Sequence, residues 1–161
     1  MTSRSPSGRL SSREFGVTMT ALLAALRESD GVILRGLHGT RARRKSDGSE
    51  VTRADKDAER ILRACLMTAW PGDVICGEEY GGTPSDRGRC WLVDPIDGTA
   101  SYVLGIPMFG TLIGLLVDGA PVLGCIHLPA LGETTYAATG QGCWLMRAGA
   151  SPRRVRVGAP R

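Results

Sequence analysis

The chain has 161 residues, of which 42% are hydrophobic and 22% charged, which suits one globular domain with a hydrophobic core. Its net charge is +4, but only 5% of its residues are aromatic and none lies within the basic run 41–45, which argues against a nucleic-acid partner. No apolar run reaches the roughly 18 residues that span a bilayer and no apolar signal segment opens the sequence, so we expect a cytoplasmic protein without membrane contact.

The N-terminal region is predicted to change from a polar tail to a helix. Residues 1–15 are rich in Ser and Arg and are predicted to be a disordered tail, with residues 16–161 forming the folded domain. From residue 17 to residue 37 the apolar side chains recur at helical spacing. This periodicity predicts an amphipathic helix.

A second helix is predicted after a basic, exposed connection over residues 38–50. Thr52 is followed three residues later by Asp55, a spacing typical of a capping box at a helix N-terminus. An apolar stripe then runs through residues 58–66, and Pro-Gly-Asp at 71–73 is expected to end the helix.

The remainder of the chain predicts short strands joined by tight turns, including an Asp-Gly hairpin signal at 118–119. The segments expected to form strands are 74–76, 90–93, 109–117, 122–128, 134–138, 142–146 and 155–157. Two N-terminal helices followed by hairpin-linked strands predict an α+β fold, with the helices packed on a mostly antiparallel sheet.

Two of the expected strands end in acidic residues. Asp94 and Asp97 follow one strand, and Gly98 and Thr99 come directly after them, where a short helix is expected to begin. Glu78 follows the neighbouring strand. Carboxylates bind hard cations such as Mg²⁺, and the free N–H groups of a helix N-terminus bind anions. The pattern therefore predicts metal-assisted hydrolysis of a phosphate ester.

Each of these residue types suits a role in a site with two cations. Asp94 at the strand end could bridge both ions, Asp97 could reach the second ion, and the Ile96 carbonyl could add a neutral ligand. Glu78 could add a further ligand and accept a hydrogen bond from the attacking water, and the Thr99 hydroxyl could orient that water. Taken singly, each pattern is more typical of a solvated turn or edge than of a functional site, and it is their conjunction at the ends of two apolar runs that favours the site.

The segment Asp94-Pro-Ile-Asp-Gly-Thr99 resembles the signature of the inositol monophosphatase family of Mg²⁺-dependent, lithium-sensitive phosphatases. The segment Gly77-Glu-Glu79 is similar to the upstream metal-binding step of that family, and residues 45–59 resemble its N-terminal motif. The resemblance extends from about residue 20 to residue 157.

The resemblance implies a role for each matching residue. The implied metal ligands are Glu78, Asp94, Asp97 and the Ile96 carbonyl. The residues implied to lie around the phosphate are Lys45, Glu78, Ile96, Asp97, Gly98 and Thr99. Glu78 and Thr99 are implied to activate the water, with Asp55 supporting Thr99.

Within the family, residues 105–116 and 121–133 look most like the histidinol-phosphatase branch. Ser101 leans the same way, because inositol enzymes more often carry Asn at this position. The resemblance thus implies a phosphatase acting on histidinol phosphate in histidine biosynthesis, with an inositol phosphate as the alternative substrate.

Full-length members of this family continue into a second α/β domain, which completes a layered αβαβα sandwich and supplies a further Asp ligand. No acidic residue follows Glu133 in this chain. We therefore expect the N-terminal half of that sandwich, truncated before the second domain. Two outcomes stay open: a phosphatase completed by a C-terminal domain or by a homodimer partner, or an incomplete metal-binding fragment that needs a complementing chain.

Overall fold

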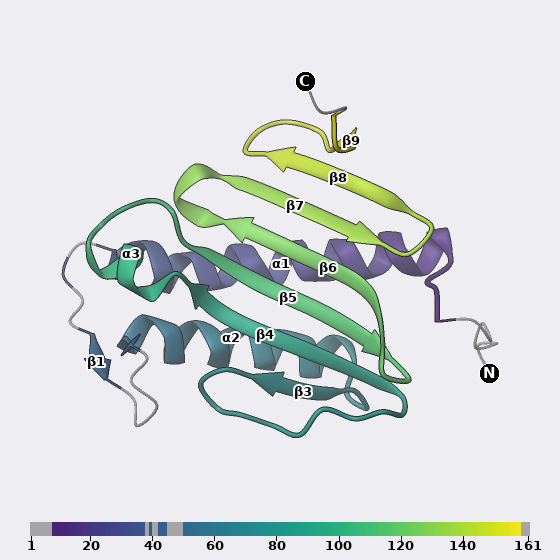
Figure 1. Ribbon diagram of the computed structural model, residues 1–161, viewed down its shortest axis with the longest axis horizontal. Coiled ribbons are helices and arrows are strands. Elements are labelled where there is room, and N and C mark those ends of the chain that lie inside the picture. The colour runs from purple at the N-terminus through teal and green to yellow at the C-terminus, as the bar shows by residue number, and fades with distance from the viewer. Residues whose placement is uncertain (1–7, 38, 40–41, 45–49, 159–161) are drawn as a thin grey trace.

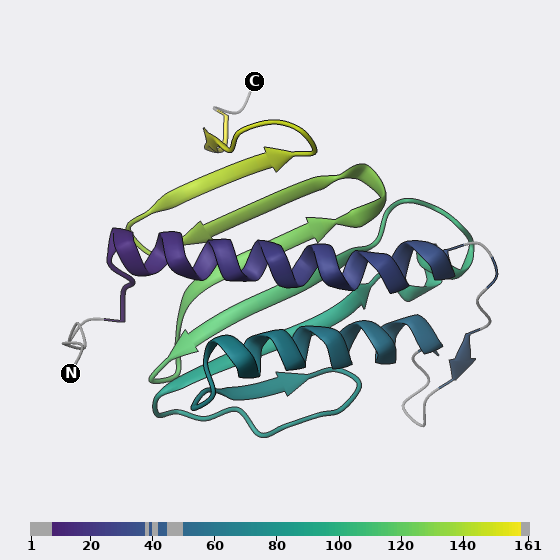
Figure 2. The same cartoon turned by 180° about the vertical axis from the view of Figure 1, so that it is seen from behind.

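The computed structural model describes residues 8–37, 39, 42–44 and 50–158. Two long helices, α1 and α2, lie against one face of a seven-stranded sheet. They lie behind the sheet in Figure 1 and in front of it in Figure 2, so both cover the same face. The α+β class predicted from the sequence is confirmed.

Helix α1 spans Ser12–Gly36 and begins earlier than the apolar periodicity predicted. Ser11 caps it, and Glu14 completes a capping box by accepting from the Ser11 backbone N–H at 2.8 Å. Leu10, just before the cap, is buried in the main core cluster. The prediction of a disordered tail as far as residue 15 is therefore wrong for its last residues, because capping and burial order this segment; residues 1–7 lie outside the described part of the chain.

Helix α2 spans Arg53–Ala69 and begins where the sequence predicted. The Thr52 hydroxyl accepts from the Ala54 and Asp55 backbone N–H groups, and the Asp55 carboxylate accepts from the Thr52 backbone N–H at 2.8 Å. These bonds satisfy N–H groups that a helix N-terminus otherwise leaves without partners. The predicted capping box is confirmed.

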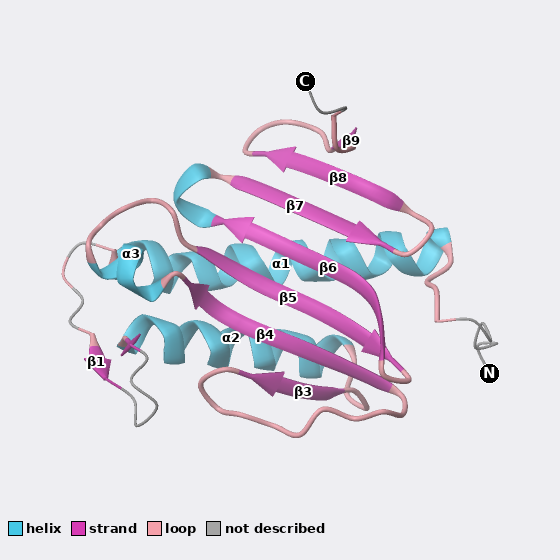
Figure 3. Cartoon of the chain, viewed as in Figure 1, coloured by secondary structure: helices cyan, strands magenta, loops and turns pink. Residues whose placement is uncertain are grey.

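The sheet has the order β3-β4-β5-β6-β7-β8-β9, coloured magenta in Figure 3. Its strands are β3 (Val74–Gly77), β4 (Arg89–Asp97), β5 (Gly110–Val117), β6 (Ala120–Leu128), β7 (Glu133–Ala138), β8 (Gly142–Arg147) and β9 (Arg153–Val155). The first two strands pair in parallel and every later neighbour is antiparallel. The helix α3 (Thr99–Val103) follows β4, a 3₁₀ turn (Pro129–Leu131) follows β6, and β1 (Arg43–Arg44) pairs with β2 (Glu50–Val51) apart from the main sheet.

The two faces of the sheet have different surroundings. Side chains on the helix-facing side, such as Trp91 and Leu115, are fully buried in a cluster with Leu22 of α1 and Leu62 of α2. Burial of such side chains contributes roughly 1.5–3 kcal/mol each, which holds the helices on the sheet. Within the described residues, no helix has the length and apolar character needed to cross a membrane.

Candidate metal centre

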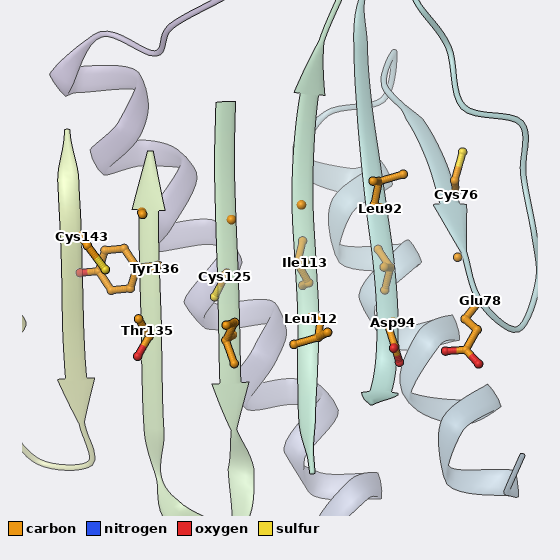
Figure 4. A pocket seen from close by; sticks show the side chains of 16 residues that line it. Cys76, Glu78, Leu92, Asp94, Leu112, Ile113, Cys125, Thr135, Tyr136 and Cys143 are labelled. Carbon is orange, nitrogen blue, oxygen red and sulfur yellow. The ribbon is translucent and has the colours of Figure 1, made fainter. Parts of the chain in front are cut away.

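The parallel pairing of β3 with β4 brings two of the predicted acidic residues together. Gly77 is the register partner of Val93, so the residues that follow them, Glu78 and Asp94, are neighbours. The Glu78 backbone N–H donates to the Val93 carbonyl at 3.0 Å, which fixes this alignment. Figure 4 shows the Glu78 side chain, just beyond the end of β3, and the Asp94 side chain, on the adjacent strand β4, at the same end of the sheet.

The environment of Asp94 disfavours its negative charge. Burial, and next to it the charge of Glu78 and a hydrogen bond with Glu78, raise the pKa of Asp94 to about 7, and the charge of Asp97 acts in the same direction. Within the described structure, Asp94 Oδ1 is buried and has no hydrogen-bond partner. A bound cation or a proton would relieve both conditions.

Strand β4 bulges between its two aspartates. The register with β5 shifts between Asp94 and Asp97, so the two carboxylates do not follow the regular alternation of a strand. The Pro95 carbonyl accepts from the buried Thr111 hydroxyl at 2.9 Å, which anchors the bulge to β5. Asp97, beyond the bulge, is exposed.

The turn after Asp97 requires glycine. Gly98 has φ of 86°, and a Cβ at this position would lie 3.1 Å from the Met108 carbonyl oxygen. The next residue, Thr99, begins α3 and donates its hydroxyl hydrogen to the Ile96 carbonyl at 3.1 Å. This bond holds the turn against the end of β4.

Asp55 lies buried in the first turn of helix α2. Its carboxylate accepts from the Thr52 hydroxyl at 2.5 Å and from the Thr52 backbone N–H. Burial raises the pKa of Asp55 despite these bonds, and the charge of Glu78 adds to the rise. Among the described residues no hydrogen bond joins Asp55 to Thr99; both bonds from Thr52 end on Asp55 Oδ2, and the support of Thr99 that the resemblance implies stays a prediction. Lys45, also implied by the resemblance, lies outside the described residues.

The donor set fits a hard cation that keeps part of its water shell. Across the described part of the chain, no three or more Asp, Glu, His or Cys side chains are grouped closely enough to hold a metal ion by themselves. Mg²⁺ nevertheless binds proteins through one or two carboxylates and retains several waters. The Glu78–Asp94 pair, with the buried unpartnered Oδ1 of Asp94, meets that requirement.

Sequence reasoning assigned no role to Glu59, a fully buried acid beneath the site. Its carboxylate accepts from the Glu79 backbone N–H at 2.7 Å, from the Tyr80 backbone N–H at 3.3 Å and from Arg63 Nε at 2.7 Å. The available signal was its position: Glu59 lies on the same buried face of α2 as Leu62 and Leu66. An acid on an apolar face needs partners, because burying an unpaired charge is costly.

The face of the sheet opposite the helices carries a shallow cavity of about 730 Å³. Apolar side chains of the strands from β3 to β8 line it, among them Leu92, Leu112 and Ile126, and Glu78 and Asp94 lie at one end. The exposed fractions of Leu92 and Ile126 are 37% and 50%. The candidate metal centre therefore adjoins an open apolar surface.

A model of the inositol monophosphatase family matches residues 17–157. Among curated proteins, the chain is 45% identical over 101 residues to a histidinol-phosphatase of Chlorobaculum parvum and 44% identical over 113 residues to that of Mycobacterium tuberculosis. It is also 44% identical over 108 residues to the inositol-1-monophosphatase SuhB of Mycobacterium tuberculosis. These matches cover 63%, 70% and 63% of this chain, but only 39%, 44% and 37% of the relatives.

Solved structures show the same arrangement over part of their length. The IMPase of Thermotoga maritima superposes with a TM-score of 0.76 at 29% identity, over 88% of this chain and 53% of that one. The suppressor protein suhB of Bartonella henselae gives 0.79 at 28% identity, over 90% and 56%. The chain thus spans about half of these structures and about two fifths of the curated relatives.

Proposed function

Because the chain belongs to the inositol monophosphatase family, we propose that it supplies the metal- and phosphate-binding groups of a phosphomonoesterase. The proposed cofactor is Mg²⁺, and its proposed ligands are Glu78, Asp94, Asp97 and the Ile96 carbonyl. The observation that carries this proposal is the meeting of Glu78 and Asp94 at adjacent strand ends, where burial and mutual repulsion raise the pKa of Asp94 to about 7. A carboxyl group whose pKa is raised by burial and by a neighbouring like charge is typical of functional sites.

Bound Mg²⁺ would polarise the phosphate and make water a better nucleophile. In the proposed reaction, Glu78 accepts a hydrogen bond from the attacking water. Thr99 gives its hydroxyl hydrogen to the Ile96 carbonyl, so a lone pair of Oγ1 is left to orient that water. The backbone N–H groups of Gly98 and Thr99 are proposed to bind the phosphate oxygens directly, since α3 has only five residues and a small dipole.

Histidinol phosphate is the proposed substrate, and an inositol phosphate is the alternative. Relatives of both names match with similar identity, so the proposal rests on the segments 105–116 and 121–133 and on Ser101. A cytoplasmic location, expected from the sequence, belongs to the same proposal.

The open apolar face suggests that the active protein needs a further layer. Contiguous exposed apolar surface of this kind marks an interaction site in soluble proteins. We propose that a C-terminal domain, carried by the same chain or by a complementing one, covers Leu92 and Ile126. A homodimer that uses this face is the alternative.

Phosphate release tests the proposed function. The chain is supplied with the C-terminal domain of a relative and assayed with histidinol phosphate and inositol 1-phosphate, with and without Mg²⁺. We expect Mg²⁺-dependent release with a higher kcat/KM for histidinol phosphate, and a loss of at least about 100-fold in Asp94→Asn, since removal of a metal ligand removes the main electrostatic stabilisation.

Asp86→Asn is the matched control, because Asp86 is an exposed loop residue beside Gly119, near the end of β4 opposite to Asp94. It should retain full activity. Release that survives both removal of Mg²⁺ and Asp94→Asn would contradict the proposed function, and a preference for inositol 1-phosphate would select the alternative substrate.

A further inference from the structure

The turn that carries Glu78 is held by hydrogen bonds from every one of its first four backbone N–H groups. The Gly77 N–H donates to the Gly81 carbonyl and the Glu78 N–H donates to the Val93 carbonyl, both at 3.0 Å. The next two N–H groups, of Glu79 and Tyr80, donate to the carboxylate of Glu59. The Glu59 side chain of α2 therefore accepts the hydrogen bonds that a neighbouring strand would otherwise accept from this turn.

Arg63 also donates hydrogen bonds to the backbone on both sides of the turn. Its Nε donates to Glu59 at 2.7 Å, its Nη1 donates to the Ile75 carbonyl at 3.2 Å, and its Nη2 donates to the Gly81 carbonyl. The exposed fraction of the Glu59 side chain is 0% and that of Arg63 is 22%, so the pair is largely withdrawn from water. Charged hydrogen bonds in such surroundings are stronger and more directional than at the surface.

The packing between the Glu59 carboxylate and the turn leaves no spare room. A Cβ at position 77 would lie 1.8 Å from Glu59 Oε1 and 2.3 Å from its Cδ. Only glycine permits this approach, so the carboxylate sits directly against the backbone that precedes Glu78. A displacement of the Glu59 carboxylate would therefore move the Gly77 backbone, which directly precedes Glu78.

We propose that the buried Glu59–Arg63 pair is a positioning device that sets cation affinity by fixing the Glu78 carboxylate beside Asp94. The inference rests on the proposed metal centre and adds to it two residues that do not touch the cation. The pair acts through the backbone of the turn. Groups that orient metal ligands in this way change metal affinity by about 10–100-fold when they are replaced.

The test compares Mg²⁺ affinity in the full 161-residue chain and in Glu59→Gln. Glutamine has the same shape, but its NH₂ group faces backbone N–H donors and Arg63, so one of the three bonds must break. We expect the Mg²⁺ Kd, measured by calorimetry, to rise about tenfold or more. Tb³⁺ bound at the same site should show a shorter luminescence lifetime, because water replaces a displaced Glu78 oxygen.

Two further variants separate positioning from stability. Arg63→Lys keeps a positive charge beside Glu59 but loses the hydrogen bonds to the Ile75 and Gly81 carbonyls. We expect it to raise the Mg²⁺ Kd less than Glu59→Gln does. Glu133→Gln breaks another Glu–Arg ion pair, between Glu133 of β7 and Arg147 of β8 at 2.6 Å, and should leave the Mg²⁺ Kd unchanged. If Glu59→Gln lowers the stability but the folded protein keeps its Kd and its Tb³⁺ lifetime, the positioning role is refuted.

Hydrogen exchange makes the outcome independent of the metal proposal. If the unmodified chain binds neither Mg²⁺ nor Tb³⁺, the proposed metal function fails. The positioning of the turn is then judged by the Glu79 and Tyr80 backbone N–H groups, which should exchange at least about tenfold faster in Glu59→Gln than in Glu133→Gln. Equal exchange in the two variants would overturn the inference.

Discussion

Replacing Asp94 with Asn is expected to make the cation-free protein more stable at neutral pH and to remove its Mg²⁺ binding. The reason is the raised pKa: burial and the charge of Glu78 lift it from the usual 3.8 to about 7. The folded state therefore holds the Asp94 proton more tightly than the unfolded state does. The stability from this group is fully present below about pH 4 and is lost as the pH rises through about 7.

The size of this effect follows from the shift. Each pKa unit corresponds to about 1.4 kcal/mol, and solvent screening of a half-buried group reduces the total, so a loss of about 2 kcal/mol between pH 4 and pH 8 is expected. In Asp94→Asn this part of the pH dependence should be absent. Mg²⁺ should reverse the trend in the unmodified protein, because the cation favours the ionised carboxylates.

Urea unfolding from pH 4 to pH 8, with EDTA or with Mg²⁺, measures this prediction. The informative quantity is the difference in unfolding free energy between the unmodified protein and Asp94→Asn, since it cancels the titration of other groups. Asp86→Asn should follow the unmodified protein. A difference that does not change with pH would contradict a raised pKa for Asp94.

Gly77→Ala is expected to destabilise the protein by about 3 kcal/mol or more. The added methyl group would overlap the Glu59 carboxylate, which is held by three hydrogen bonds and cannot withdraw without leaving buried groups without partners. The strain falls on the end of β3, directly before Glu78, so cation binding should weaken as well.

Gly124→Ala provides the matched control for this substitution. Gly124 also lies in a strand, β6, and a Cβ there would meet no atom within 4 Å. Chemical unfolding should show a change within about 0.5 kcal/mol for Gly124→Ala. If Gly77→Ala is equally mild, the close contact between Glu59 and the turn is not a real constraint.

Local signals in the sequence predicted much of this fold. The spacing of Thr52 and Asp55 located the start of α2, and the Asp-Gly step at 118–119 located the turn between β5 and β6. The start of α1 was missed although Ser11 and Glu14 have capping-box spacing, because the polar composition of residues 1–15 suggested disorder. The capping box at Ser11 and the burial of Leu10 order this segment despite its polar composition.

Long-range features were harder to predict. The acidic ends of two apolar segments suggested that Glu78 and Asp94 converge, but the register that makes them neighbours comes from the pairing of β3 with β4. The backbone partners of Glu59 depend on how α2 lies against this edge of the sheet. Nothing in the local sequence specifies that its carboxylate will meet the Glu79 and Tyr80 backbone N–H groups.

Acids from two adjacent strand ends are proposed to hold one shared cation, and the rest of the proposed chemistry depends on this arrangement. Calorimetric titration of Mg²⁺ into the unmodified protein, Glu78→Gln, Asp94→Asn and the double variant tests it most directly. We expect each single change to weaken binding at least about tenfold and the double variant to lose much less than the sum of the two. Undiminished Mg²⁺ binding in both single variants would show that the cation, if bound, lies elsewhere.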